Sequence, residues 1–202
     1  QGLLRTNLYN DVLNLLEVWV HEVLYLRAVY PEHHFKERTA FQLVVHTAKT
    51  ASLAAISGIY AGLELNDLSR ISKYSVLPCR VELSIIDEHS HQPLEIHEFT
   101  LQPVEMPLAK ETTRWAFQEL DFKSFLVDTT DKLKRLPQSS RGKTFALDVL
   151  LRVDNSKQIA NLAEQWSTSQ STTSSQLHDC TFLRSANIEI TSSILLPQEN
   201  KP

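Results

Sequence analysis

Residues 12–30 (VLNLLEVWVHEVLYLRAVY) form the segment that limits the possible folds most strongly. Apolar residues recur there at helical spacing, but they cover most of the helix circumference. A helix with this distribution is buried on most sides, so the segment predicts the central helix of a packed domain. We expect Asn10 or Asp11 to cap its start, because a side-chain oxygen accepts hydrogen bonds from free backbone N–H groups. We expect Pro31 to end it, since the residue before a proline is driven out of the helical region.

A cluster of histidines and charged residues, EHHFKE (32–37), follows directly after Pro31. A zinc site needs three or four ligands. Adjacent histidines in a loop seldom point toward one ion, and no third ligand is evident nearby. The pattern is therefore more typical of a solvated loop than of a metal or catalytic site at His33 and His34. The same interpretation holds for His89 and His91.

Two further helices are expected after this loop. Residues 40–45 (AFQLVV) first predict a short strand, and residues 50–68 then predict the second helix. Residues 110–137 predict the third helix, which Pro137 closes. The apolar face of that third helix consists of Trp115, Leu120 or Phe122, Leu126 and Leu133.

The period of the apolar residues changes to two in the middle of the chain. Residues 79–86 (CRVELSII) and 94–101 (LEIHEFTL) flank a short polar loop and predict a β-hairpin. The apolar phase slips between Ile96 and Phe99, which suggests a β-bulge there. Residues 144–153 (TFALDVLLRV) alternate cleanly and predict another strand.

The remaining residues, 154–202, have a different character. Residues 167–176 (STSQSTTSSQ) are a polar run that cannot bury enough apolar surface to order itself. The chain then returns to β character, with Ile188, Ile190, Ile194 and Leu196 sharing one parity. We therefore expect one domain over residues 1–202, with a core at 1–153 and a C-terminal β segment that docks onto it. Helices on one face of a small antiparallel sheet make this an α+β fold.

Composition excludes several classes of function. The net charge is −4, which argues against a broad nucleic-acid-binding surface. Two cysteines without a CxxC motif exclude a thiolate zinc site, and only four glycines leave no phosphate-binding or nucleophile-elbow motif. No apolar run reaches about 18 residues, so no membrane span is expected. These features point to a soluble intracellular protein without a cofactor.

Residues 15–38 (LLEVWVHEVLYLRAVYPEHHFKER) resemble the first helix of the HORMA-domain accessory subunits of translesion DNA polymerase zeta. Residues 84–99 resemble the central hairpin of that family, and residues 144–151 resemble the strand that follows. The matching positions of the first helix are Leu16, Glu17, Val18, Val20, His21, Leu24, Tyr25, Arg27, Val29, Tyr30, Pro31, Phe35 and Arg38.

This resemblance implies a HORMA fold, in which three helices pack on a small antiparallel sheet. It also implies that residues 154–202 form a safety belt, a C-terminal segment that wraps over a short peptide of a partner. That peptide adds to the sheet as a strand. In this family it contains proline and comes from the catalytic subunit of DNA polymerase zeta. The belt surface then meets the second translesion polymerase, a deoxycytidyl transferase, so the protein acts as a non-enzymatic adaptor in the nucleus.

The resemblance also places site residues. Leu53, Ile56 and Trp166 fall where the family contacts the peptide. Cys180, Ile194 and Leu196 fall on the surface that faces the second polymerase, and Lys123 falls where two HORMA domains pair. No catalytic residue, metal ligand or direct nucleic-acid contact is implied.

Three alternatives stay open at this point. The first is a HORMA adaptor of a spindle-checkpoint or meiotic complex, against which the Tyr30–Pro31 motif argues. The second is a HORMA adaptor in DNA-end protection or control of resection. The third, in another class, is a small α+β enzyme that uses the histidine loop.

Overall fold

The computed structural model describes residues 2–49, 78–103, 115–151, 175–185 and 188–197. The predicted second helix lies outside these ranges. Within them the chain forms α1 (Gly2–Leu26), the short 3-10 helix η1 (Glu32–His34), β1 (Phe35–Ala40), β2 (Leu43–Ala48), β3 (Pro78–Asp87), β4 (Pro93–Pro103), α4 (Trp115–Arg135), β5 (Lys143–Leu151), β6 (Ser175–Ser185) and β7 (Ile188–Pro197). None of the described helices is long and apolar enough to cross a membrane.

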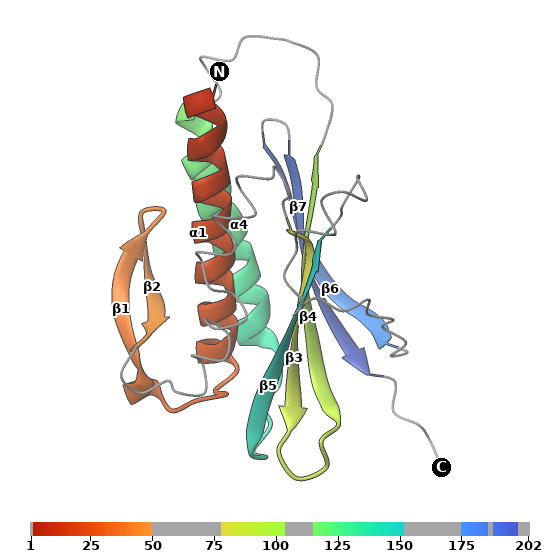
Figure 1. The fold of residues 1–202 in the computed structure, drawn as a ribbon. Helices are drawn as coiled ribbons and strands as arrows, with labels where there is room; N and C mark the ends of the chain where they lie inside the picture. Colours follow the sequence, from red (N-terminus) through yellow and green to blue (C-terminus); the bar gives the residue numbers. More distant parts are fainter. Residues whose placement is uncertain (1, 50–77, 104–114, 152–174, 186–187, 198–202) are drawn as a thin grey trace, which may run out of the picture.

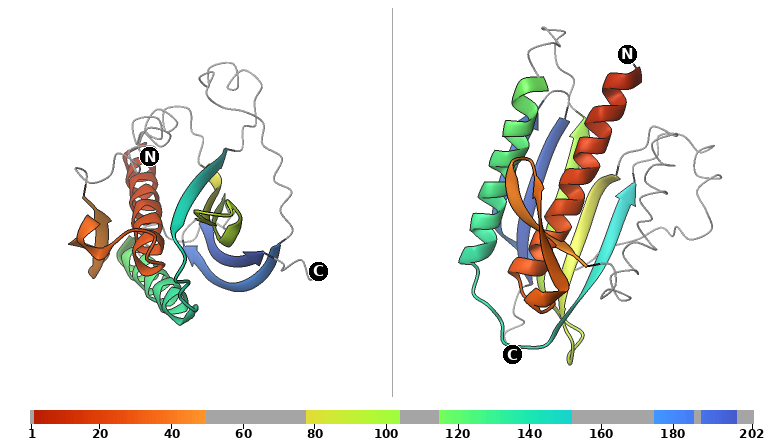
Figure 2. Two further views of the ribbon diagram at one scale, coloured as in Figure 1. Left: turned by 90° about the horizontal axis from the view of Figure 1, so that it is seen from below. Right: turned by 90° about the vertical axis from the view of Figure 1, so that its left-hand side faces the viewer.

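The elements are arranged in three layers. Strands β5, β3, β4, β7 and β6 pair in this order in one antiparallel sheet. Helices α1 and α4 cover one face of that sheet, and the separate β1–β2 hairpin lies on the far side of α1 (Figures 1 and 2). This arrangement confirms the predicted α+β architecture.

Helix α1 is the central element, as its sequence predicts. Its apolar side chains face the sheet, α4 and the hairpin, and Leu15, Val18 and Val23 are fully buried. The Trp19 ring lies 5.5 Å from the ring of Phe99 on β4. Each such large side chain contributes about 1.5–3 kcal/mol when it leaves water, so this helix supplies much of the driving force for folding.

Both predicted ends of α1 are wrong. The helix begins at Gly2, so Asn10 and Asp11 lie inside it rather than at its cap. It ends at Leu26, ahead of Pro31, because the following residues form a Schellman motif. Val29 N donates to Leu24 O and Ala28 N donates to Tyr25 O, each at 3.0 Å, and Ala28 has a φ of 50°.

The predicted strand at residues 40–45 is confirmed only in part, because residues 43–45 belong to β2 whereas residues 41–42 form a turn. Ala40 pairs with Leu43, and the two residues between them, Phe41 and Gln42, have φ values of 49° and 57°. Two left-handed residues make the type I′ turn that suits a tight hairpin, although Asn-Gly is its usual sequence. The Phe41 ring packs edge-on against Phe122 of α4 at 5.5 Å. This tertiary contact offsets the cost of the left-handed backbone.

The β3–β4 hairpin is confirmed, but its irregularity lies elsewhere than predicted. The register is continuous past Ile96 and Phe99, and it shifts only between Ile85 and Ile86, next to the turn. The apolar phase slips because Glu95 and His97 occupy the core-facing positions that precede Phe99. Both are buried.

Helix α4 and strand β5 are confirmed, and of the two alternatives for the helix face the structure selects Phe122. Phe122, Phe125, Leu126 and Leu133 are buried, whereas Leu120 is 48% exposed. The side chains of Phe145 and Leu147 on β5 pack against the core.

The described part of the C-terminal segment has the predicted β character, and its two strands pair as a β-hairpin. Strand β7 pairs with β4, and β6 pairs with β7. Ile190 and Ile194 of β7 and Leu183 of β6 are buried, so the hairpin completes the core. Strand β6 begins at Ser175, so the last two residues of the predicted polar tether, Ser175 and Gln176, belong to a strand instead.

Candidate functional site

Two edges bound the five-stranded sheet. Strand β6 of the C-terminal hairpin forms the edge on the β4 side, and β5 forms the opposite edge. Among the described residues β5 pairs only with β3, from Lys143 to Leu151. An edge strand presents N–H and C=O groups that can pair with another extended chain. This edge is therefore a candidate site for strand addition.

The end of α1 supports the start of β5. The Tyr30 ring lies edge-on to Phe145 at 6.0 Å. The Lys143 amine donates to the carbonyl oxygen of Arg27 at 2.6 Å. Burial lowers the pKa of Lys143, and the neighbouring Arg27 charge lowers it further, whereas Glu95 raises it. Strand β5 is thus tied to the helix layer at its first residues.

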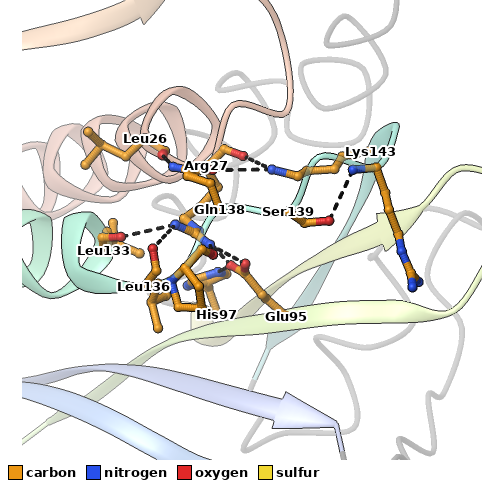
Figure 3. Close-up of polar contacts among 11 residues, drawn as sticks. Leu26, Arg27, Glu95, His97, Leu133, Leu136, Gln138, Ser139 and Lys143 are labelled. Atoms are coloured by element: carbon orange, nitrogen blue, oxygen red, sulfur yellow. Dashed lines mark hydrogen bonds and ion pairs between the residues drawn. The ribbon is translucent and has the colours of Figure 1, made fainter.

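A buried ion pair lies beside this junction (Figure 3). The Arg27 guanidinium has no exposed surface and binds Glu95 of β4 bidentately, with Nε–Oε2 at 2.9 Å and Nη2–Oε1 at 2.5 Å. His97 Nε2 lies 2.9 Å from the same carboxylate. Burial by itself raises the pKa of Glu95, but hydrogen bonds and charge from His97 and Arg27 outweigh it and lower that pKa to about 2. Glu95 is therefore a carboxylate at neutral pH.

The same guanidinium also caps the C-terminus of α4. It donates to the carbonyl oxygens of Leu133, Leu136 and Pro137 at 3.2, 3.3 and 2.7 Å. The last carbonyls of a helix have no partners within the helix and carry partial negative charge, so a cation there satisfies both requirements. We call Arg27, Glu95 and His97 the buried ionic cluster. It joins α1, α4 and β4 in one network, and Lys143 connects that network to β5.

Polar contacts also hold the C-terminal hairpin against both helices. Trp19 Nε1 on α1 donates to Ser192 Oγ on β7 at 2.9 Å, in a buried position. Lys132 on α4 lies 3.1 Å from the Asp179 carboxylate on β6. The hairpin is thereby held on the β4 side of the sheet.

The structure describes four of the seven site residues that the resemblance implies. Leu53, Ile56 and Trp166 lie outside the described residues. Cys180 is exposed on β6, and Leu196 is half-buried on β7. Ile194 is only 3% exposed, so it belongs to the core and not to the surface in this conformation.

Lys123 is half-buried on α4. It lies between two residues of the same helix, Leu120 and Val127, that are 48% and 37% exposed. The surface of α4 around Lys123, where the resemblance implies pairing with a second HORMA domain, is therefore partly apolar.

The histidine loop forms η1 and the start of β1. His33 is exposed, His34 is half-buried, and their rings lie 4.2 Å apart. Lys49 donates to the backbone carbonyl of His33 at 2.8 Å. In the described part of the chain, no group of three or more histidine, cysteine, aspartate or glutamate side chains is placed to hold a metal ion.

Sequence reasoning missed the buried ionic cluster, although a signal was present. Phe99 and Leu101 define the core-facing parity of β4, and Glu95 and His97 share it. Polar residues at core-facing positions need buried partners. Arg27, a cation within the apolar α1 segment, was the available counterpart.

Comparison with known proteins identifies the fold. A chain of the mitotic checkpoint complex superposes with a TM-score of 0.74 at 15% identity, over 95% of this chain and 99% of that chain. C. elegans HTP-2 bound to HTP-3 closure motif 1 gives 0.67 at 12% identity, over 93% and 85%. C. elegans HTP-1 bound to the HIM-3 closure motif gives 0.62 at 12% identity, over 91% and 88%.

No protein-family model matches the sequence, and no curated protein matches it either. The likeness to these structures, at such low identity, concerns the fold alone. The chain adopts the HORMA fold that they share.

Proposed function

We propose that this protein is a non-enzymatic adaptor, which captures a short extended segment of a partner as an additional strand beside β5. One observation carries the proposal. Strand β6 of the C-terminal hairpin forms one edge of the sheet, and β5 forms the other edge, where another strand can add. Backbone hydrogen bonds would supply affinity, and contacts to alternate side chains would supply specificity.

The compared structures support a peptide ligand. HTP-1 and HTP-2 share this fold and were solved with closure motifs of HIM-3 or HTP-3 bound. In our proposal residues 154–202 act as the belt that retains the peptide, and Leu53, Ile56 and Trp166 contact it.

We further propose that the peptide belongs to the catalytic subunit of DNA polymerase zeta. The motif of residues 15–38 supports this assignment. The protein would then work in the nucleus and bridge that subunit to the deoxycytidyl transferase, through the surface that carries Cys180 and Leu196. Pairing with a second HORMA domain would use the α4 surface around Lys123.

A second candidate function is an adaptor in a checkpoint or meiotic complex. The superposition on a chain of the mitotic checkpoint complex favours it. The two functions share the strand-addition step and differ only in the peptide, so one experiment addresses both.

Titration calorimetry with the full chain tests the proposal. Proline-containing peptides from the polymerase zeta catalytic subunit of the same organism are scanned beside peptides from checkpoint and meiotic partners. The best peptide is then remade with single backbone N-methyl groups along its length. We expect N-methylation to abolish binding at alternate positions only, because alternate amides of an added strand face the sheet.

Two results would overturn the proposal. One is that no peptide of any class binds the full chain. The other is that N-methylation has no periodic effect, which would mean that the peptide does not bind as a strand. Preference for a checkpoint or meiotic peptide would overturn only the polymerase assignment.

A further inference from the structure

One lysine links helix α4 to the C-terminal hairpin. Lys132 Nζ lies 3.1 Å from Asp179 Oδ1 and also donates to the backbone carbonyl of Cys180. The side chain of Lys132 is 26% exposed and that of Asp179 is 42% exposed. Both groups are therefore partly hydrated, and the contact can break and re-form without exposing the core.

A β-bulge places the Asp179 side chain on the face of β6 that is directed toward Lys132. The β6–β7 register shifts between Leu177 and Asp179, so His178 is the extra residue. The shift reverses the phase of the strand. Leu177 is 57% exposed, whereas Asp179 has the same parity as the buried Thr181 and therefore faces the helices.

The Asp179 carboxylate is oriented and ionised for its contact with Lys132. Oδ1 accepts a hydrogen bond from Cys180 N at 2.8 Å. Burial raises the pKa of Asp179, but the hydrogen bonds from Lys132 and Cys180 N and the positive charges of Lys132 and His178 lower it below its ordinary value. The carboxylate is therefore ionised at neutral pH.

Strand β6 pairs with β7 along its length, but few of its other side chains hold it against the helix layer. Leu183 is the one buried apolar side chain among the described residues of β6, while Leu177 and Phe182 are each 57% exposed. Ile190 and Ile194 anchor β7 instead. Segments with few buried apolar contacts open locally at low free energy. A single polar contact is thus a sizeable part of what holds β6 to the helix layer.

We propose that Lys132 is a latch residue, which holds β6 against α4 and slows local opening of the C-terminal hairpin. A consequence follows that rests on the proposed function. If the hairpin belongs to the belt that retains a peptide, Lys132 also slows release of that peptide.

Amide hydrogen exchange on the full chain without peptide tests the latch. The variant is Lys132→Gln, the conservative control is Lys132→Arg, and Lys134→Gln is the matched control on the same helix. We expect the amides of Thr181 and Leu183 to exchange about two- to fivefold faster in Lys132→Gln, as for the loss of a partly exposed ion pair. The two control variants should exchange like the parent protein, and so should amides in the β3–β5 ladder.

Asp179→Asn and the double variant Lys132→Gln/Asp179→Asn complete a double-mutant cycle. The effects of Lys132→Gln and Asp179→Asn should not add, because both variants remove the Lys132–Asp179 ion pair. Additive effects would overturn the proposal. So would unchanged exchange in Lys132→Gln, or an equal acceleration in the β3–β5 ladder, which would indicate a global loss of stability.

A separate measurement tests the consequence for release. Once a binding peptide is known, its dissociation rate from Lys132→Gln should rise by about the same factor as exchange at Thr181. Faster exchange with an unchanged dissociation rate would overturn the consequence and leave the latch standing. If no peptide binds the parent protein, the proposed function fails while the exchange result still decides the latch.

Discussion

At the scale of single residues, the fold keeps two buried ionisable groups in opposite states. Glu95 stays charged because Arg27 and His97 surround it. His21 is only 2% exposed and stays neutral. Burial is the larger cause that lowers the pKa of the His21 imidazole to about 4, and the Arg38 charge adds to it. Whether a buried group of this protein is charged therefore depends on the charged and hydrogen-bonding groups that surround it.

The neutral His21 makes stability depend on pH. An unfolded histidine takes up a proton near pH 6.5, whereas folded His21 does so only near pH 4. Between these values the unfolded state binds more protons, so the free energy of unfolding falls as the pH falls. The shift corresponds to a loss on the order of 3 kcal/mol.

Urea unfolding at about pH 7.5 and about pH 4.5 checks this prediction. The loss of stability between the two pH values should be smaller in His21→Gln than in the parent protein. Carboxylates such as Glu95 contribute equally to both proteins and cancel in the difference. Identical losses would contradict the prediction.

At the scale of elements, the ends and turns are defined by backbone conformations that the residue types do not favour. Ala28, Phe41 and Gln42 all have positive φ values, where glycine or asparagine is usual. Two of them, Ala28 and Phe41, lie beside tertiary contacts. At Ala28 the Schellman motif brings Arg27 into the buried ionic cluster, and at Phe41 the side chain reaches Phe122.

The left-handed Ala28 predicts a stabilising substitution. Ala28 is exposed, so Ala28→Gly removes no packing and relieves the steric cost of its Cβ. We expect a gain of about 0.5–1 kcal/mol in the free energy of unfolding. Ala146, exposed on β5 and without a positive φ, supplies the control, and Ala146→Gly should be destabilising. Chemical denaturation of both variants distinguishes these signs, and destabilisation by Ala28→Gly would contradict the Schellman assignment.

At the scale of the whole molecule, one guanidinium connects the helix layer to the sheet. Arg27 reaches β4 through Glu95 and the end of α4 through three carbonyl oxygens, and its own carbonyl receives Lys143 from β5. Strand β5, which we propose receives a peptide, is therefore held by a contact to Arg27, the residue that also connects α1 to α4.

Removal of Arg27 should leave the buried charge of Glu95 with His97 as its remaining partner. We expect Arg27→Met to cost about 3–5 kcal/mol, because Glu95 loses its bidentate partner and three carbonyl oxygens at the end of α4 lose their donor. The double variant Arg27→Met/Glu95→Leu should recover part of this loss, since it removes the stranded carboxylate as well. Urea denaturation of the single and double variants measures both effects. A loss below about 1 kcal/mol in Arg27→Met would show that the cluster contributes little to stability.

Local patterns in the sequence determined a large part of this architecture. The wide apolar arc of residues 12–30 predicted the central helix, and two-residue alternation predicted β3, β4, β5 and the C-terminal strands. These predictions hold because apolar period and secondary structure are linked by backbone geometry alone. The resemblance of residues 15–38 pointed to the HORMA fold, which the superpositions confirm.

Only the tertiary structure decided the features that depend on contacts between distant residues. The type I′ turn at Phe41–Gln42 packs on the ring of Phe122, and the core-facing Glu95 pairs with Arg27 and His97. The order β5-β3-β4-β7-β6, which leaves β5 at an edge, depends on how the last hairpin docks. Local propensity carries no information about such partners, because their free energies arise only when the chain brings them together.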